Sequence, residues 1–180
     1  MLAAGTILKA QVMQENVDFS VWPKGELNTA YAKYFIGNSY LAPLGADEGG
    51  PVNVTFEPRC RNNWHVHHRS VQVLVCVAGR GWYQEWGKEP VVMRPGTVIA
   101  IPAEAKHWHG AARDSWFQHV TYMTRVEEGA SNEWLDPVTD EDVAEELKKL
   151  QDRNSRLVAV EEEECASDVT TALQPPRLLV

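Results

Sequence analysis

The sequence predicts an all-β domain, a sandwich or barrel of which the double-sheet jelly roll is one form. Between residues 31 and 125, short runs rich in β-branched and aromatic residues alternate with turns that contain Gly or Pro. No segment with helical periodicity interrupts them. All six histidines of the chain also fall within this region, between residues 65 and 119.

The strand-like runs follow one another at short, regular spacing. They are expected at 34–36, 39–41, 52–56, 71–77, 81–86, 91–93, 97–101 and 117–122. Two turns between them have the composition of hairpins, Ala78-Gly79-Arg80-Gly81 and Gly87-Lys88-Glu89-Pro90. The sequence therefore predicts a barrel over residues 31–125, preceded by an N-terminal arm at 1–30.

The composition changes near Asp136, where the β-type runs end. Thr139 and the acidic residues after it are typical of a helix N-terminus, and Val143, Leu147 and Leu150 recur at helical spacing. We expect a helix over 139–153, within a C-terminal helical segment of 126–153, packed outside the barrel. The polar stretch 154–180 contains four consecutive glutamates and is expected to be a disordered tail.

Bulk composition excludes several classes of function. The chain has 180 residues, a formal net charge of −8 and a pI near 5.2, which argue against nucleic acid or an anionic membrane as the main partner. Three scattered cysteines do not form a disulfide framework, and Cys76 is expected in the core. No signal peptide or membrane-spanning stretch is evident, so a cytoplasmic protein with a small-molecule partner is expected.

The spacing of the histidines is typical of a metal site. His65 and His67 lie two apart in a predicted strand, so their imidazoles point to the same face, roughly 6–7 Å apart. Gln72 begins the next strand and could add a neutral amide oxygen. His107 and His109 share a face of a later strand. Three histidines and a glutamine would leave a divalent ion its full charge, which favours Lewis-acid chemistry.

Each of these residues also has a structural interpretation. Gln72 could form hydrogen bonds inside the barrel, and His119, on a later strand, could be a hydrogen-bonded core residue. One of His107 and His109 could bind the metal, while the other acts as a pocket base or donates a hydrogen bond to a metal-binding residue. His68 has the opposite parity and is expected to be exposed. Trp64, Trp108 and Trp116 could line a ligand pocket, although packing is the favoured interpretation for most tryptophans.

The pattern His65-x-His67-x4-Gln72-x6-Gly79, followed by Pro95-Gly96-x5-Pro102-x4-His107, resembles the two motifs of the cupin family. Together with Trp64, Gly81-Trp82 and 106–112, it is similar to small bacterial cupins that include the manganese-dependent hydroxynitrile lyases. The usual cupin glutamate is replaced here by Gln72. The resemblance implies a double-stranded β-helix barrel, usually dimeric. It also implies His65, His67, Gln72 and His107 as metal ligands, and His109 and His119 as catalytic pocket residues.

Three functions are compatible with these motifs. The favoured one is a lyase-type enzyme that uses a divalent metal, Mn or Fe before Zn or Ni, as Lewis acid and a pocket histidine as base. The second is an O2-dependent oxidoreductase, which the neutral Gln72 disfavours. The third is a cupin that binds a small ligand without catalysis, which the additional His109 and His119 disfavour.

Overall fold

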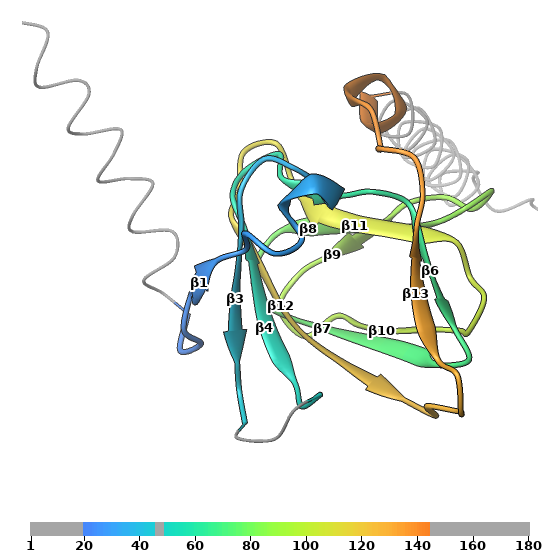
Figure 1. The fold of residues 1–180 in the computed structure, drawn as a ribbon. Helices are drawn as coiled ribbons and strands as arrows, with labels where there is room; N and C mark the ends of the chain where they lie inside the picture. Colours follow the sequence, from blue (N-terminus) through green and yellow to red (C-terminus); the bar gives the residue numbers. More distant parts are fainter. Residues whose placement is uncertain (1–19, 46–48, 145–180) are drawn as a thin grey trace, which may run out of the picture. The chain divides into compact units, whose positions relative to one another are not determined.

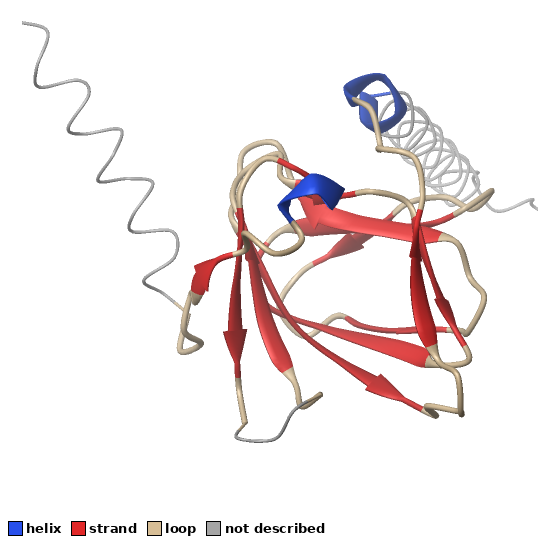
Figure 2. Ribbon diagram, in the orientation of Figure 1, coloured by secondary structure: helices blue, strands red, loops and turns tan. Residues whose placement is uncertain are grey.

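The computed structural model describes residues 20–45 and 49–144, and almost all of their regular structure is β-strand (Figures 1 and 2). The chain divides into one unit that ends at Thr139 and a second unit that begins at Asp140. The described strands all belong to the first unit, where they form two antiparallel sheets.

The first sheet has six strands in the order β1-β3-β4-β12-β7-β10. Their bounds are β1 Glu26–Leu27, β3 Ser39–Pro43, β4 Val52–Phe56, β12 Phe117–Thr124, β7 Val71–Gly79 and β10 Val98–Ile101. Strand β12 pairs with β7 along its whole length, with a register shift between Gln118 and His119, and with β4 from Phe117 to Thr121. This irregularity lies beside a histidine of the predicted site.

The second sheet follows the order β13-β6-β11-β5-β2, and β8 adds to the other side of β11 and carries β9. The bounds are β13 Ser131–Trp134, β6 His65–His68, β11 His107–Ala111, β5 Arg61–Asn62, β2 Phe35–Ile36, β8 Gly81–Glu85 and β9 Val91–Met93. A short 3-10 helix, η1 Ala32–Tyr34, precedes β2. Each of the strand-like runs predicted from the sequence coincides with an observed strand.

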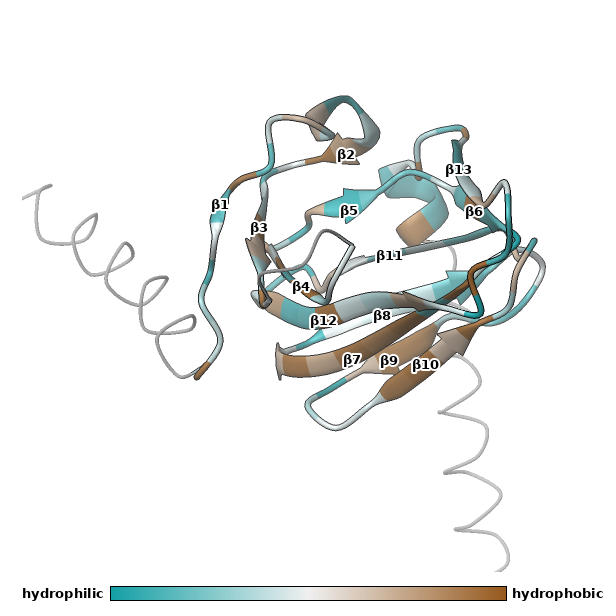
Figure 3. Ribbon diagram, turned by 60° about the horizontal axis from the view of Figure 1, so that its bottom comes forward, coloured by the Kyte–Doolittle hydropathy of each residue, from teal (hydrophilic) through white to brown (hydrophobic). Residues whose placement is uncertain are grey.

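The hydrophobic core fills the space between the two sheets. Strand β7 contributes Leu74 and Cys76, both buried, from the face that also carries Gln72. Phe56 of β4 and Phe117 of β12 are fully buried beside them. Figure 3 shows β7 and β10 as hydrophobic over most of their length. The prediction of a jelly-roll barrel and the prediction that Cys76 is a core residue are both confirmed.

The two predicted hairpins have different outcomes. The turn at 87–90 joins the paired strands β8 and β9, as expected. The hairpin at Ala78–Gly81 is wrong, because β7 pairs only with β10 and β12 whereas β8 pairs with β9 and β11. This turn carries the chain from one sheet to the other. Gly79 has φ +71°, and a Cβ there would lie 1.8 Å from the Trp116 carbonyl oxygen, so only glycine fits.

The strands extend beyond the range 31–125 expected for the barrel. Strand β1 lies in the expected N-terminal arm, and β13 lies in the segment expected to be helical. The sequence of β13, Ser-Asn-Glu-Trp, has no apolar alternation, so its strand character comes from pairing with β6. Residues 140–144 are helical, while the rest of the helix expected to residue 153, the arm 1–19 and the tail 154–180 lie outside the described residues. No helix among the described residues is long and apolar enough to cross a membrane.

Candidate metal centre

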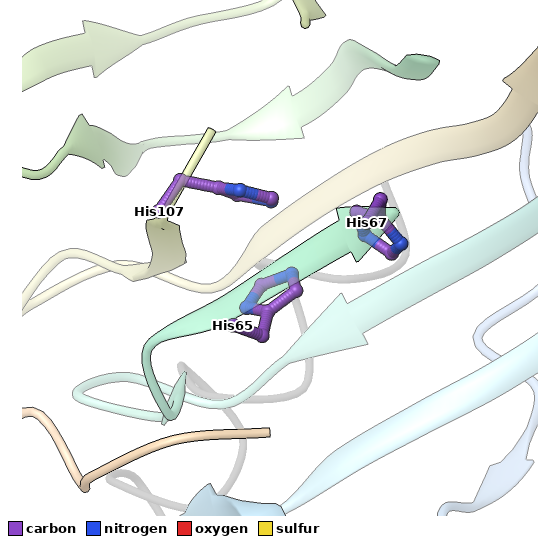
Figure 4. Close-up of side chains that lie close together, drawn as sticks. All are labelled: His65, His67 and His107. Carbon is purple, nitrogen blue, oxygen red and sulfur yellow. The ribbon is translucent and has the colours of Figure 1, made fainter. Parts of the chain in front are cut away.

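Three of the predicted ligands converge from neighbouring strands of one sheet. His65 and His67 project from β6, and His107 is paired with His65 at the start of β11 (Figure 4). All three side chains are buried, and one ring nitrogen from each lies within 4.8 Å of those from the other two. The spacing of two residues between His65 and His67 thus puts both rings on the same face of the strand, as predicted.

Gln72 reaches the same point from the opposite sheet. Its Oε1 lies 3.0 Å from Nε2 of His67 and 3.0 Å from Nε2 of His107. The Gln72 amide nitrogen donates a hydrogen bond to Thr121 Oγ1 at 3.1 Å, which turns the amide oxygen toward the histidines. Both sheets therefore contribute to the cluster, and the four predicted ligands lie together.

The Nδ1 atom of each clustered histidine faces an oxygen. His65 Nδ1 lies 3.0 Å from the carbonyl oxygen of Asn63, and His107 Nδ1 lies 2.8 Å from that of Ala105. His67 Nδ1 lies 2.5 Å from Asn132 Oδ1. Because these oxygens accept hydrogen bonds, each Nδ1 carries a proton and donates it, which leaves each Nε2 with a lone pair.

Lone pairs then face one another inside the cluster. The Nε2 atoms of His67 and His107 and the Oε1 atom of Gln72 are all acceptors at 3.0 Å separation, an arrangement that is unfavourable unless a positive charge lies between them. Three neutral imidazoles with one amide oxygen are suitable ligands for a first-row divalent ion. The residues present therefore fit the metal that the motifs imply.

Burial keeps these histidines neutral. It lowers the pKa of His65 well below the usual value and lowers the pKa of His67, and in both cases desolvation is the largest cause. Burial also lowers the pKa of His107 to about 4. A proton therefore competes weakly for Nε2 at neutral pH, so the site is ready for a cation.

A second pair of histidines lies next to the cluster. The ring of His109 is 5.6 Å from that of His65 and 4.8 Å from that of His119, measured between centroids. Asn62 accepts a hydrogen bond from the backbone N–H of His109 at 2.9 Å, and its Nδ2 lies 3.0 Å from His109 Nε2. The amide therefore donates to the ring, which identifies Nε2 of His109 as an acceptor.

His119 has a buried ring whose polar atoms have no partner. It is fully buried between Phe56 and Phe117, and neither of its ring nitrogens has a hydrogen-bond partner in the structure. Burial lowers its pKa to about 3, so the ring is neutral at physiological pH. Unpaired buried polar atoms are costly, and a ligand in the adjacent cavity could supply the missing partner here. His119 is therefore not a hydrogen-bonded core residue, which was the alternative role considered for it from the sequence.

Three residues of the cluster, His65, His67 and Gln72, border a cavity of about 300 Å³. Its polar end contains the site residues His65, His67, Gln72, His109 and His119, together with Asn62, Thr121 and Asn132. Its other walls are mainly apolar, from Phe35, Leu41, Val52, Val54, Met123 and Trp134, with Asn28, Tyr31, Tyr122, Gly49 and Gly50 completing the lining. A small organic molecule could therefore lie against the apolar walls and direct a polar group toward the histidines.

The remaining sequence predictions concern residues outside the cavity. Trp64, Trp108 and Trp116 do not line it; Trp64 packs edge-on against Trp108, in agreement with the packing interpretation. His68 is only partly exposed, and its nitrogens lie 2.5 Å from Glu104 Oε2 and 3.0 Å from Glu133 Oε2. The hydrogen bond to Glu104 is the largest reason that the pKa of His68 is raised.

Four residues with a role in the site were not predicted: Asn62, Thr121, Asn132 and Trp134. Asn62 and Asn132 contact histidines through side-chain amides, and Trp134 stacks on His65 with 4.8 Å between centroids. Asn132 and Trp134 contact histidines more than sixty positions away, and only the register of β13 against β6 reveals the pairing. The Asn62-Asn63 pair, separated from His65 only by Trp64, was the one local feature that could have indicated a role for Asn62.

Comparisons with known proteins agree with this architecture. The cupin-domain profile Cupin_2 matches residues 52–116. An (R)-mandelonitrile lyase of Granulicella tundricola is 39% identical over 114 residues, which cover 61% of this chain and 86% of that protein. A crystal structure of a cupin-like protein from Thermotoga maritima is 36% identical with a TM-score of 0.61, covering 68% of this chain and 92% of that one. The fold, the two motifs and these relatives together show that this chain belongs to the cupin family.

Proposed function

We propose that this protein is a metal-dependent lyase that cleaves a small aromatic cyanohydrin into an aldehyde and hydrogen cyanide. The observation that carries the proposal is the convergence of four neutral ligand atoms beside a buried histidine that has no hydrogen-bond partner. The similarity to an (R)-mandelonitrile lyase supports the reaction class, since its name denotes cleavage of an aromatic cyanohydrin.

His65, His67, Gln72 and His107 would hold the ion, with manganese or iron as the first choice. Zinc would compete during purification, because the usual affinity order places it above both. The ion would supply Lewis acidity toward the hydroxyl oxygen of the substrate. Since none of the four ligands is charged, the pocket keeps its attraction for a developing alkoxide.

His119 is proposed to handle the proton. As a neutral ring it can accept the hydroxyl proton of the substrate, while the O–H electron pair becomes the second bond of the carbonyl group. The carbon–carbon bond to the nitrile breaks as that second bond forms, and its electron pair leaves with cyanide. Burial disfavours the protonated ring, so its proton passes on to cyanide as hydrogen cyanide forms. His109, 4.8 Å away between centroids and held by Asn62, is the second candidate for this role.

The cavity supports a compact substrate with an aromatic group. Its volume of about 300 Å³ suits a molecule the size of a single substituted ring, and most of the lining side chains other than the histidines and amides are apolar. Phe35 offers aromatic surface in the lining, whereas Trp134 is already stacked on His65 and on Tyr34. A substrate ring there would direct its hydroxyl and nitrile groups toward the polar end.

The test uses racemic mandelonitrile with protein reconstituted with Mn(II) or Fe(II). Benzaldehyde release is followed optically, spontaneous decomposition without protein is subtracted, and an oxygen electrode records O2 uptake. We expect metal-dependent cleavage without O2 consumption. Cleavage coupled to stoichiometric O2 uptake, or no reaction with cyanohydrins by the metal-loaded protein, would contradict the proposal.

The proton-transfer role is tested with His119→Ala. This variant should retain the ion while its kcat falls by about 10²–10⁴-fold, the usual loss of a general base. His109→Ala is the matched comparison, because this histidine lies beside His119 but its ring already has a partner in Asn62. If both variants keep full activity, neither histidine is the base.

A further inference from the structure

Strand β13 is the edge strand of its sheet and lies directly against the two clustered histidines of β6. The pairing register puts Asn132 opposite His67 and Trp134 opposite His65. Both residues also line the cavity. Opposite residues on paired strands share one face, so β13 presents these two side chains to the same histidines that point into the site. Neither residue belongs to the matched cupin segment 52–116.

The contact with Asn132 differs in kind from those of the other two clustered histidines. His65 and His107 each face a backbone carbonyl through Nδ1, whereas His67 faces the side-chain oxygen of Asn132. A backbone acceptor two residues away is fixed by the strand itself. The acceptor for His67 instead comes from a residue 65 positions along the chain, so it depends on β13 being in place.

The tautomer of His67 decides whether it can serve as a ligand. With the proton on Nδ1, its Nε2 has a lone pair directed at the point shared with Gln72 Oε1 and His107 Nε2. With the proton on Nε2, the ring would donate to Gln72 and could not bind a cation there. Hydrogen-bond partners of this kind fix both the tautomer and the orientation of metal-binding histidines.

We propose that Asn132 is a positioning residue of the metal centre, holding His67 in its Nδ1-protonated tautomer and aiming Nε2 at the ion. This inference rests on the proposed metal site. Trp134 supports the same arrangement at the neighbouring pair: it stacks on His65 at 4.8 Å and is itself stacked on Tyr34 at 4.6 Å with 7° between the planes. Strand β13 therefore restrains both ligands that β6 supplies.

Two substitutions separate the acceptor from the bulk of the side chain. Asn132→Leu keeps a similar size and removes the acceptor, and Asn132→Asp keeps an oxygen acceptor. The dissociation constants for Mn(II) and Co(II) are measured by competition with a chelator. We expect Asn132→Leu to weaken metal binding by about 10–100-fold, as for other residues that hold metal-binding histidines. Asn132→Asp should bind at least as tightly as the wild type.

Glu133→Gln is the matched control. Glu133 lies on the same strand but faces His68 on the outside, so its change removes the charge from a contact between β13 and β6 without touching His67. The metal dissociation constant of this variant should remain within a few-fold of the wild type. An equal loss in Glu133→Gln and Asn132→Leu would mean that β13 acts only through strand pairing, and would overturn the proposal.

A spectroscopic readout tests the role without any variant. Long-range ¹H–¹⁵N NMR of the metal-free wild type reports which ring nitrogen of His67 carries the proton. We expect Nδ1–H in the wild type and a gain of the Nε2–H tautomer in Asn132→Leu. A wild-type ring protonated on Nε2 would refute the role of Asn132 even if Asn132→Leu failed to fold. Absence of metal binding by the wild type would instead contradict the proposed metal site.

Discussion

Strands β7 and β13 both supply residues to the same cavity, yet they are held in place by different forces. Strand β7 is a nine-residue, largely apolar run in the middle of its sheet, and its inward side chains Leu74 and Cys76 are buried in the core. Strand β13 is a four-residue polar segment at the edge of the other sheet, with three of its residues exposed. Burial of apolar surface stabilises β7, whereas specific contacts to β6 hold β13.

This difference implies that the two strands affect different properties of the protein: β7 the free energy of unfolding, and β13 the binding of metal. Gln72 lies on a strand whose neighbouring residues Leu74 and Cys76 are packed in the core, so folding of the core is enough to position it. Asn132 lies on a strand whose position depends on pairing with β6 and on the stacking of Trp134 on Tyr34. Changes in the core-facing apolar residues of β7 should therefore alter mainly the free energy of unfolding, and changes in β13 mainly the affinity for metal.

The largest expected effect on stability is that of Leu74→Ala. Leu74 is fully buried within the main apolar cluster, so the substitution should lower the free energy of unfolding by about 2–5 kcal/mol through lost burial and the cavity left behind. Urea unfolding of the metal-free protein measures this. The metal dissociation constant of the folded variant should stay within a few-fold of the wild type. A large loss of affinity there would remove the contrast between the two strands.

The sequence predicted β7 well and β13 not at all, for a physical reason. A short continuous run of apolar, mostly β-branched residues bounded by turn residues indicates a buried strand, and Val71–Gly79 is such a run. The His-x-His spacing likewise constrained the geometry of His65 and His67 locally. Residues 131–134 have no such pattern, and the contact of Asn132 with His67 requires knowledge of a register between distant segments. The turn at Ala78–Gly81 failed for a related reason: its composition indicates a turn but does not reveal that the chain changes sheets.

Acid should destabilise the metal-free protein because its buried histidines resist protonation. Burial lowers the pKa of His107 to about 4 and that of His119 to about 3. The unfolded chain, with ordinary histidines, binds more protons below about pH 6.5, so their contribution is complete above that pH and is lost as pH falls toward 3. We expect a loss on the order of a few kcal/mol across this window.

Chelator-treated protein is unfolded with urea at several pH values to measure this dependence. His119→Phe is the matched variant, since it keeps an aromatic ring next to Phe56 and Phe117 but removes the titrating group. Its stability should depend less steeply on pH than that of the wild type. The same pH dependence in both proteins would mean that protonation of His119 does not oppose folding.

The smallest expected effect is that of Gln72→Glu, which changes charge without changing shape. The variant should retain the ion but bind anions such as cyanide more weakly and turn over more slowly, because the carboxylate cancels one unit of positive charge. Cyanide inhibition constants and kcat of the metal-loaded proteins measure this. Faster turnover or tighter cyanide binding in the variant would contradict a role for the neutral amide in keeping the site cationic.

The central claim is that one divalent ion binds among His65, His67, Gln72 and His107. An anomalous difference map from crystals of the manganese-reconstituted protein tests it most directly. We predict a single strong peak within about 2.0–2.4 Å of the three Nε2 atoms and Gln72 Oε1, the usual range for such ligands, and no peak in crystals of His67→Ala treated identically. A peak elsewhere, no peak in the wild type, or a full-occupancy ion retained at this position by His67→Ala would contradict the account.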